Sequence, residues 1–291
     1  MKITKFFFLI IIVSLIIPAQ IFCQFGKNKV QYQNFSWKYL ETKHFDIYFH
    51  NNAQYLAEFT AVEAEKSLKS IENTLNFKVQ KRNAIIVYNS HNEFEQTNVV
   101  DALMSEGIGG FTESLKNRVV VPFQGDYAQL RHVIHHELVH AVLNEMLYGG
   151  TFQTSLYTGR NIQFPIWMNE GLAEYESIGG LDTQTDMYMR DVSLSEGMID
   201  LEYFDGFLAY RGGQTFYWYV AEKYGEQMVG DLINRIRTFG NLDAAFKSSF
   251  KLDLKEFSKE WKKDMKKYYW PDIEKFTDAD DYAEIITDIS K

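Results

Sequence analysis

HVIHHELVH, residues 132–140, is the stretch on which the fold depends, because it sets four histidines and a glutamate in an otherwise apolar run. Imidazole and carboxylate groups are costly to bury unless they have partners. On an α-helix, side chains four positions apart lie on the same face, which brings His136 and His140 together. Two such imidazoles can hold one metal ion, and Glu137, about 100° round the helix, can act beside it as a general base.

Two further histidines in this stretch offer another register. His132 and His136 are also four apart, but no glutamate follows His132 directly, so this pair does not place a general base. His135 points in a different direction on the helix. We therefore expect His132 and His135 to be surface residues or partners of the metal ligands.

A third metal ligand is expected from PIWMNEGLAEY, residues 165–175. A catalytic zinc site has three protein ligands and one open position. Pro165 opens a helix after a loop, and Glu170 lies in its first turns as the expected third ligand. Glu174, one turn later, can accept the free ring N–H of a ligating histidine and so fix its tautomer. The alternative is an exposed amphipathic helix with two solvated glutamates.

The surrounding sequence predicts an α+β fold. A small mixed α/β half, residues 24–125, precedes an all-helical half, residues 126–270, and the helix with the histidines joins them. An acidic tail or linker follows at residues 271–291. The expected strands lie within 45–49, 83–90 and 118–123, and the expected helices within 53–75, 126–146, 165–179, 185–195, 207–224, 226–238 and from 253 to a stop before Pro271.

The N-terminus reads as a secretory signal peptide over residues 1–23. Lys2 and Lys5 precede an apolar run, residues 6–17, which Pro18 ends. An uncleaved anchor is one alternative, and lipidation at Cys23 is another, although the bulky residues before it do not suit a lipobox. We expect an exported protein that is periplasmic, associated with the outer membrane or extracellular. Cys23 is the only cysteine, so no internal disulfide is expected after cleavage.

The composition limits the class of partner. A formal net charge of -9 without a basic stripe argues against nucleic acid. A hydrophobic content of 46% is enough for a sizeable core. Nucleic acid is therefore not an expected partner, whereas association with the cell envelope would follow from export.

HELVH with the downstream NEGLAEY resembles the gluzincins, the zinc peptidases whose third ligand is a glutamate on a second helix. The N-E-G-x-A-x-Y form is similar to their aminopeptidase branch and to the broader peptidase MA-like group. The resemblance implies a zincin-like fold with His136, His140 and Glu170 as zinc (Zn2+) ligands and Glu137 as the catalytic base. The gap from His140 to Glu170 is longer than in the best-known gluzincins, and the loop at 149–164 can absorb it.

AYRGGQ, residues 209–214, resembles the tyrosine motif that follows in those enzymes. It makes Tyr210 the expected donor to the oxyanion, and a packing role is the other interpretation of this tyrosine. Arg211 is a weaker alternative donor and a candidate substrate-binding residue. GFTES, residues 110–114, is similar to the aminopeptidase loop that holds a substrate's free α-amine, which makes Glu113 a candidate amine ligand. Strand 118–123 is expected to be the edge strand that pairs with an extended substrate.

The resemblance covers roughly residues 30–270 and is closest to exported proteins of the Bacteroidetes type, in which this domain often precedes β-propeller repeats. No such repeats follow in the sequence, so a single-domain member or a piece of a longer chain is expected. The resemblance implies an exported zinc metallopeptidase whose substrate is a peptide or protein. The alternative is a catalytically silent zinc-binding scaffold or assembly module of the envelope.

Overall fold

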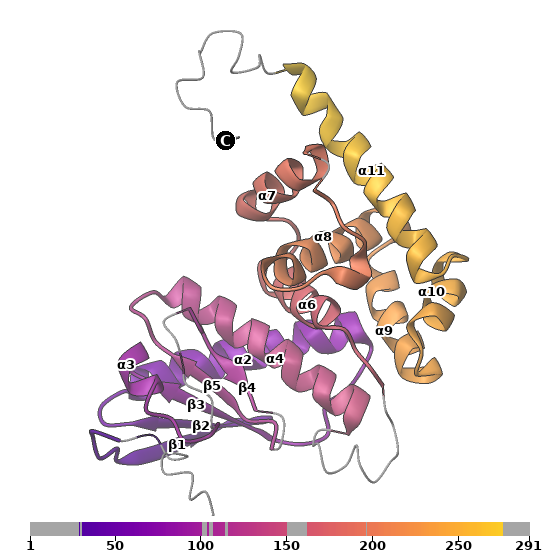
Figure 1. Ribbon diagram of the computed structural model, residues 1–291. Coiled ribbons are helices and arrows are strands. Elements are labelled where there is room, and N and C mark those ends of the chain that lie inside the picture. Colours follow the sequence, from indigo (N-terminus) through magenta and orange to yellow (C-terminus); the bar gives the residue numbers. More distant parts are fainter. Residues whose placement is uncertain are drawn as a thin grey trace, which may run out of the picture.

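The computed structural model describes residues 29, 31–100, 104, 107–113, 116–149, 162–195 and 197–275. The predicted signal peptide and residues 276–291 of the predicted tail lie outside these residues. Within the described part, the helices are all too short or too polar to cross a membrane. The chain has an α+β architecture, with a small mixed sheet in its first half and mainly helices after it (Figure 1).

The sheet has the strand order β1-β2-β3-β5-β4. β1 (Trp37–Glu41) and β2 (Phe45–His50) form an antiparallel hairpin. β2, β3 (Asn83–Tyr88) and β5 (Val119–Pro122) are parallel, and helix α2 (Gln54–Leu75) makes the crossover from β2 to β3. The short strand β4 (Phe111–Thr112) runs antiparallel to β5 at the edge. The short helix α3 (His91–Phe94) begins at Ser90, whose hydroxyl accepts from the Glu93 amide.

The central strands are buried because both faces of the sheet are covered. Val119 and Val121 point into the main core with α2 and α4, whereas Val120 joins a smaller core with Tyr88 and Phe94. Helix α4 (Tyr127–Tyr148) packs against β4 and β5 on one side and against α6 on the other. It therefore lies between the two halves of the molecule (Figure 1).

The helical half packs round a core of large aromatic side chains, among them Trp167, Phe216, Phe257 and Trp261. It consists of α6 (Ile166–Ile178), α7 (Thr183–Leu194), a 3-10 turn (Leu201–Tyr203), α8 (Phe207–Tyr224), α9 (Gln227–Phe239), α10 (Leu242–Phe250) and α11 (Leu254–Lys275). Asp253 and Glu256 bond each other's backbone amides at the start of α11, as a capping box does.

Two expectations about these elements are wrong. Strand β5 is not the edge strand beside α4, because β4 pairs with its outer side. Helix α11 does not stop before Pro271 but continues to Lys275. Burial of Trp261, Met265 and Tyr269 anchors this helix, and Pro271 removes a single backbone donor about one turn before its end. Helix α10, which begins at the N-cap Asn241, was not expected.

Candidate metal centre

Helix α4 carries the histidine stretch and is fixed at both ends. The Asp126 carboxylate accepts from the Ala128 amide at 2.7 Å, which caps the first turn, and Gly149 ends the helix in the left-handed conformation. Leu138, Val139 and Val142 are fully buried. Because the middle of this helix is covered on both sides, His136 and Glu137 project into protein rather than into open solvent.

Helices α6 and α8 approach so closely that only glycine fits between them. A Cβ built on Gly171 would lie 2.4 Å from the Gly213 Cα, and one on Gly213 would lie 2.2 Å from the Trp167 carbonyl oxygen. Gly171 directly follows Glu170, and Gly213 comes three residues after Tyr210. The glycines of the two motifs therefore allow the contact that brings both of these side chains to α4.

The three expected ligands converge. The Glu170 Oε2 lies 3.3 Å from the His136 Nε2 and 3.3 Å from the His140 Nε2. Donor atoms of the three residues all lie within 4.8 Å of one another, so this group can hold a metal ion. A second group of the same kind, His132, His136 and Glu174, shares His136 with the first.

The donor set fits a tetrahedral metal. Bonds of about 2.0–2.1 Å place neighbouring ligand atoms of a tetrahedral site about 3.3 Å apart. Charge-assisted hydrogen bonds would be shorter, at about 2.7–2.9 Å. The His136 Nδ1 lies 3.0 Å from the Glu174 Oε1, at an angle outside a regular hydrogen bond. Glu174 is therefore placed to hold the tautomer that leaves the His136 Nε2 free for a metal.

Comparison with known families agrees with this geometry. A sequence profile of the Peptidase MA superfamily matches residues 63–267, which is more than half of the chain and includes α4, α6 and α8. The chain belongs to the Peptidase MA superfamily. No curated protein matches it. Membership implies a peptidase-type, metal-dependent function with peptide or protein substrates, and the α+β architecture is consistent with the zincin-like fold.

The histidines and glutamates of the ligand group strongly shift one another's pKa values. Burial alone would lower the pKa of His136, but the neighbouring carboxylates of Glu170 and Glu174 raise it to about 10. Burial would raise the pKa of Glu170, yet the two histidines lower it to about 2. The pKa of Glu174 is lowered in the same way, by His132 and His136. The metal-free site thus favours ionised carboxylates, as a cation site requires.

Glu137 is buried beside the ligands and has a partner that the sequence did not reveal. The Thr112 hydroxyl lies 2.8 Å from the Glu137 Oε2 and 2.8 Å from the Glu137 carbonyl oxygen. Thr112 belongs to β4, so the edge strand supplies the group that orients the carboxylate. The only indication in the sequence is that Thr112 lies within GFTES, a stretch whose resemblance to the aminopeptidase loop points to Glu113 and not to Thr112.

Tyr210 lies against the ligand group. Its ring stacks on His136 with centroids 6.2 Å apart and an interplanar angle of 13°, and the side chain remains 37% exposed. Burial, and then the charge and hydrogen bond of Glu170, raise the pKa of Tyr210 well above its usual range. The hydroxyl therefore stays protonated at neutral pH and can donate a hydrogen bond.

Arg211 and Glu113 are both engaged in ion pairs within the protein. The Arg211 Nη1 lies 3.1 Å from the Glu174 Oε2, and the Arg118 Nε donates to the Glu113 Oε2 at 2.7 Å. Glu113 is also buried. A substrate amine would have to compete with Arg118 for this carboxylate.

The two remaining histidines lie at different places. The His132 Nε2 is 3.5 Å from the Glu174 Oε1, so His132 contacts the carboxylate that faces His136. The His135 Nε2 is 4.0 Å from the Glu176 Oε2 and lies outside both candidate ligand groups. Burial lowers the pKa of His135 to about 4, and the neighbouring histidines act in the same direction.

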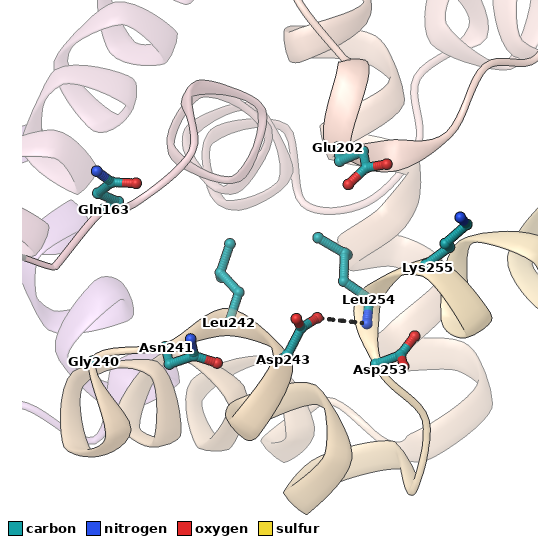
Figure 2. Close-up of a pocket in the computed structure, with 9 residues that line it drawn as sticks. All are labelled: Gln163, Glu202, Gly240, Asn241, Leu242, Asp243, Asp253, Leu254 and Lys255. Carbon is teal, nitrogen blue, oxygen red and sulfur yellow. Dashed lines mark hydrogen bonds between the residues drawn. The ribbon is translucent and has the colours of Figure 1, made fainter.

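A separate polar pocket lies where α9, α10 and α11 meet (Figure 2). Glu202, Asp243 and Asp253 line it together with Lys255. The Asp243 Oδ1 accepts from the Leu254 amide at 3.2 Å, and Asp253 caps α11. Asp243 and Asp253 therefore serve the local fold, and among the described residues the carboxylates of this pocket form no group with metal-binding geometry.

Proposed function

We propose that the protein is an exported zinc-dependent peptidase of the gluzincin type. The observation that carries the proposal is the meeting of the His136 Nε2, the His140 Nε2 and the Glu170 Oε2, with Glu137 next to His136 on the same helix. A silent structural site has no need of a general base there. The resemblance to exported Bacteroidetes proteins and the apolar N-terminus support the same assignment of location.

His136, His140 and Glu170 would hold the zinc ion, with Glu174 behind His136. Zinc held by these residues would polarise a scissile carbonyl and would lower the pKa of water to about 7. Glu137 takes a proton from the attacking water and delivers it to the leaving amine. Thr112 holds the Glu137 carboxylate in place for both transfers. The Tyr210 hydroxyl donates to the negative charge that develops on the carbonyl oxygen.

Substrate binding is assigned to the neighbouring edge. Strand β4, rather than β5, has an open side beside α4 and is the strand with which an extended substrate would pair. Glu113, at its end, is the proposed partner of a free α-amine, displacing Arg118. Cleavage of N-acetylated peptides at the rate of free ones would remove this role of Glu113.

The test compares wild type with Glu137→Gln for zinc content and for hydrolysis of a mixed peptide library. Zinc in both proteins and turnover in wild type alone support the peptidase. Zinc without turnover in either supports the scaffold alternative, and absence of zinc from wild type rejects both. Glu145→Gln is a matched control, since Glu145 lies on the same helix and is 7% exposed against 6% for Glu137. It should keep both zinc and activity.

N-terminal sequencing of the protein recovered from cell fractions tests export. A mature N-terminus near residues 20–24 in the envelope or medium is the expected result. Intact protein in the cytoplasm would reject the proposed location without affecting the peptidase.

A further inference from the structure

Glu174 is a buried carboxylate on which three side chains converge. Its Oε1 lies 3.0 Å from the His136 Nδ1 and 3.5 Å from the His132 Nε2, and its Oε2 lies 3.1 Å from the Arg211 Nη1. A buried carboxylate needs a compensating partner. A metal-bound histidine is neutral, so the permanent charge that offsets Glu174 comes from Arg211.

Arg211 is itself held from the far side by α7. Its Nη1 also lies 3.4 Å from the Asp182 Oδ2 and 3.2 Å from the Thr185 Oγ1, and its Nη2 lies 3.3 Å from the Gln184 Oε1. Asp182 is the N-cap of α7 and accepts from the Thr185 amide at 2.8 Å. The guanidinium also lies 5.5 Å from the centre of the Phe207 ring. Its position is therefore fixed before any ligand arrives.

These contacts assign Arg211 a role different from substrate binding. Its side chain is 17% exposed, and both terminal nitrogens already face oxygens of the protein. We infer that Arg211 is a positioning residue that fixes the Glu174 carboxylate against His136, and that it thereby sets the affinity of the site for zinc. The inference rests on the proposed function, because it takes His136 as a zinc ligand.

The effect should be seen in metal affinity, since partners behind a ligating histidine typically change it about 10- to 100-fold. Zinc affinity is measured by competition with a chromophoric chelator, and circular dichroism of the metal-free proteins checks folding. Arg211→Gln should weaken zinc binding by about 10-fold or more, and Arg211→Lys should restore part of the loss. Arg131→Gln is the control, because Arg131 on α4 also pairs with a carboxylate and lies over a ring, at Glu63 and Phe59.

A double-mutant cycle with Glu174→Gln shows whether Arg211 acts through Glu174. The loss caused by Arg211→Gln should disappear when Glu174 is already glutamine. A loss of full size in that background, or a zinc affinity equal to that of wild type in the single variant, would overturn the inference. If Arg211→Gln does not fold, the same comparison is made with Arg211→Lys. This variant should lose a few-fold in zinc affinity when Glu174 is present and nothing when Glu174 is already glutamine. A wild-type protein without zinc affinity would instead reject the proposed function.

Discussion

Helix α4 presents histidines to glutamates of α6 in two places, and the two pairs differ in charge. His136 meets Glu174 at 3.0 Å and Glu170 at 3.3 Å, and the pKa of His136 is raised to about 10. His135 meets Glu176 at 4.0 Å. Burial lowers the pKa of His135 to about 4 and raises that of Glu176 to about 7, so both groups tend toward their neutral forms.

The difference shows what makes a site out of common residue types. Both pairs are largely buried, and burial disfavours the charged form of each group. At His136 two carboxylates lie at contact distance and offset that penalty, whereas at His135 a single carboxylate is too far away to do so. Convergence of several groups, rather than the presence of a histidine and a glutamate, separates the candidate metal centre from its neighbour.

The largest contrast is expected from the histidines. His136→Ala should weaken zinc binding by roughly a hundredfold or more, because it removes a ligand. Loss of a residue that only supports a ligand typically weakens metal binding about 10- to 100-fold. His135→Ala should change it by no more than about 2-fold, because His135 lies outside the ligand groups. Chelator competition measures both. A comparable loss in the two variants would mean that the ligand register on α4 has been misidentified.

Substitution of Glu174 and of Glu176 on α6 should give a similar but smaller contrast in zinc affinity. Glu174→Gln is expected to weaken zinc binding by about 10- to 100-fold, since the amide is a poorer acceptor for the His136 ring N–H. Glu176→Gln should leave the affinity within about 2-fold, because Glu176 contacts no proposed ligand. Isothermal titration of the metal-free proteins with zinc provides the measurement. Equal affinities for wild type and Glu174→Gln would show that this carboxylate does not support His136.

Much of this arrangement was predictable from the sequence because the signals are local. The spacing of His136 and His140, the cap Asp126, and the glycines that end α4 and α6 define elements within a few residues of where they lie. The expectation that Glu174 lies near a ligating histidine follows from its position one turn after Glu170, and the structure places its Oε1 3.0 Å from the His136 Nδ1.

The contacts between distant segments were not predictable in the same way. Thr112 reaches Glu137 only because two-residue β4 pairs outside β5, and a strand so short leaves no periodic pattern. The sequence suggests a substrate-binding role for Arg211, but its neighbours come from the start of α7, which no spacing rule connects with α8. The continuation of α11 through Pro271 depends on tertiary packing that outweighs the local preference.

The smallest effect concerns the pair of His135 and Glu176 and is expected in the pH dependence of the free energy of unfolding. The pKa of Glu176 is raised from 4.5 to about 7, chiefly by burial and also by the charge of Glu226, while a hydrogen bond from Thr74 opposes the shift. The folded state therefore binds this proton more tightly than the unfolded state does. The contribution of Glu176 to stability is complete below about pH 4.5, falls as the pH rises, and is lost above about pH 7.

Glu176→Gln keeps the neutral form at every pH, so it should match wild type at pH 4 and exceed it in free energy of unfolding by about 1–3 kcal/mol at pH 8. Urea unfolding of the metal-free proteins at both pH values measures this difference. Glu222→Gln, which removes an exposed carboxylate of α8, serves as the control. Its difference in free energy of unfolding from wild type should be the same at both pH values. A Glu176→Gln protein that is less stable at pH 8 would mean that Glu176 is ionised in the fold and stabilised by His135. The His136 and His135 pairs would then differ only in degree, and the short distances at His136 would no longer explain why the candidate metal centre lies there.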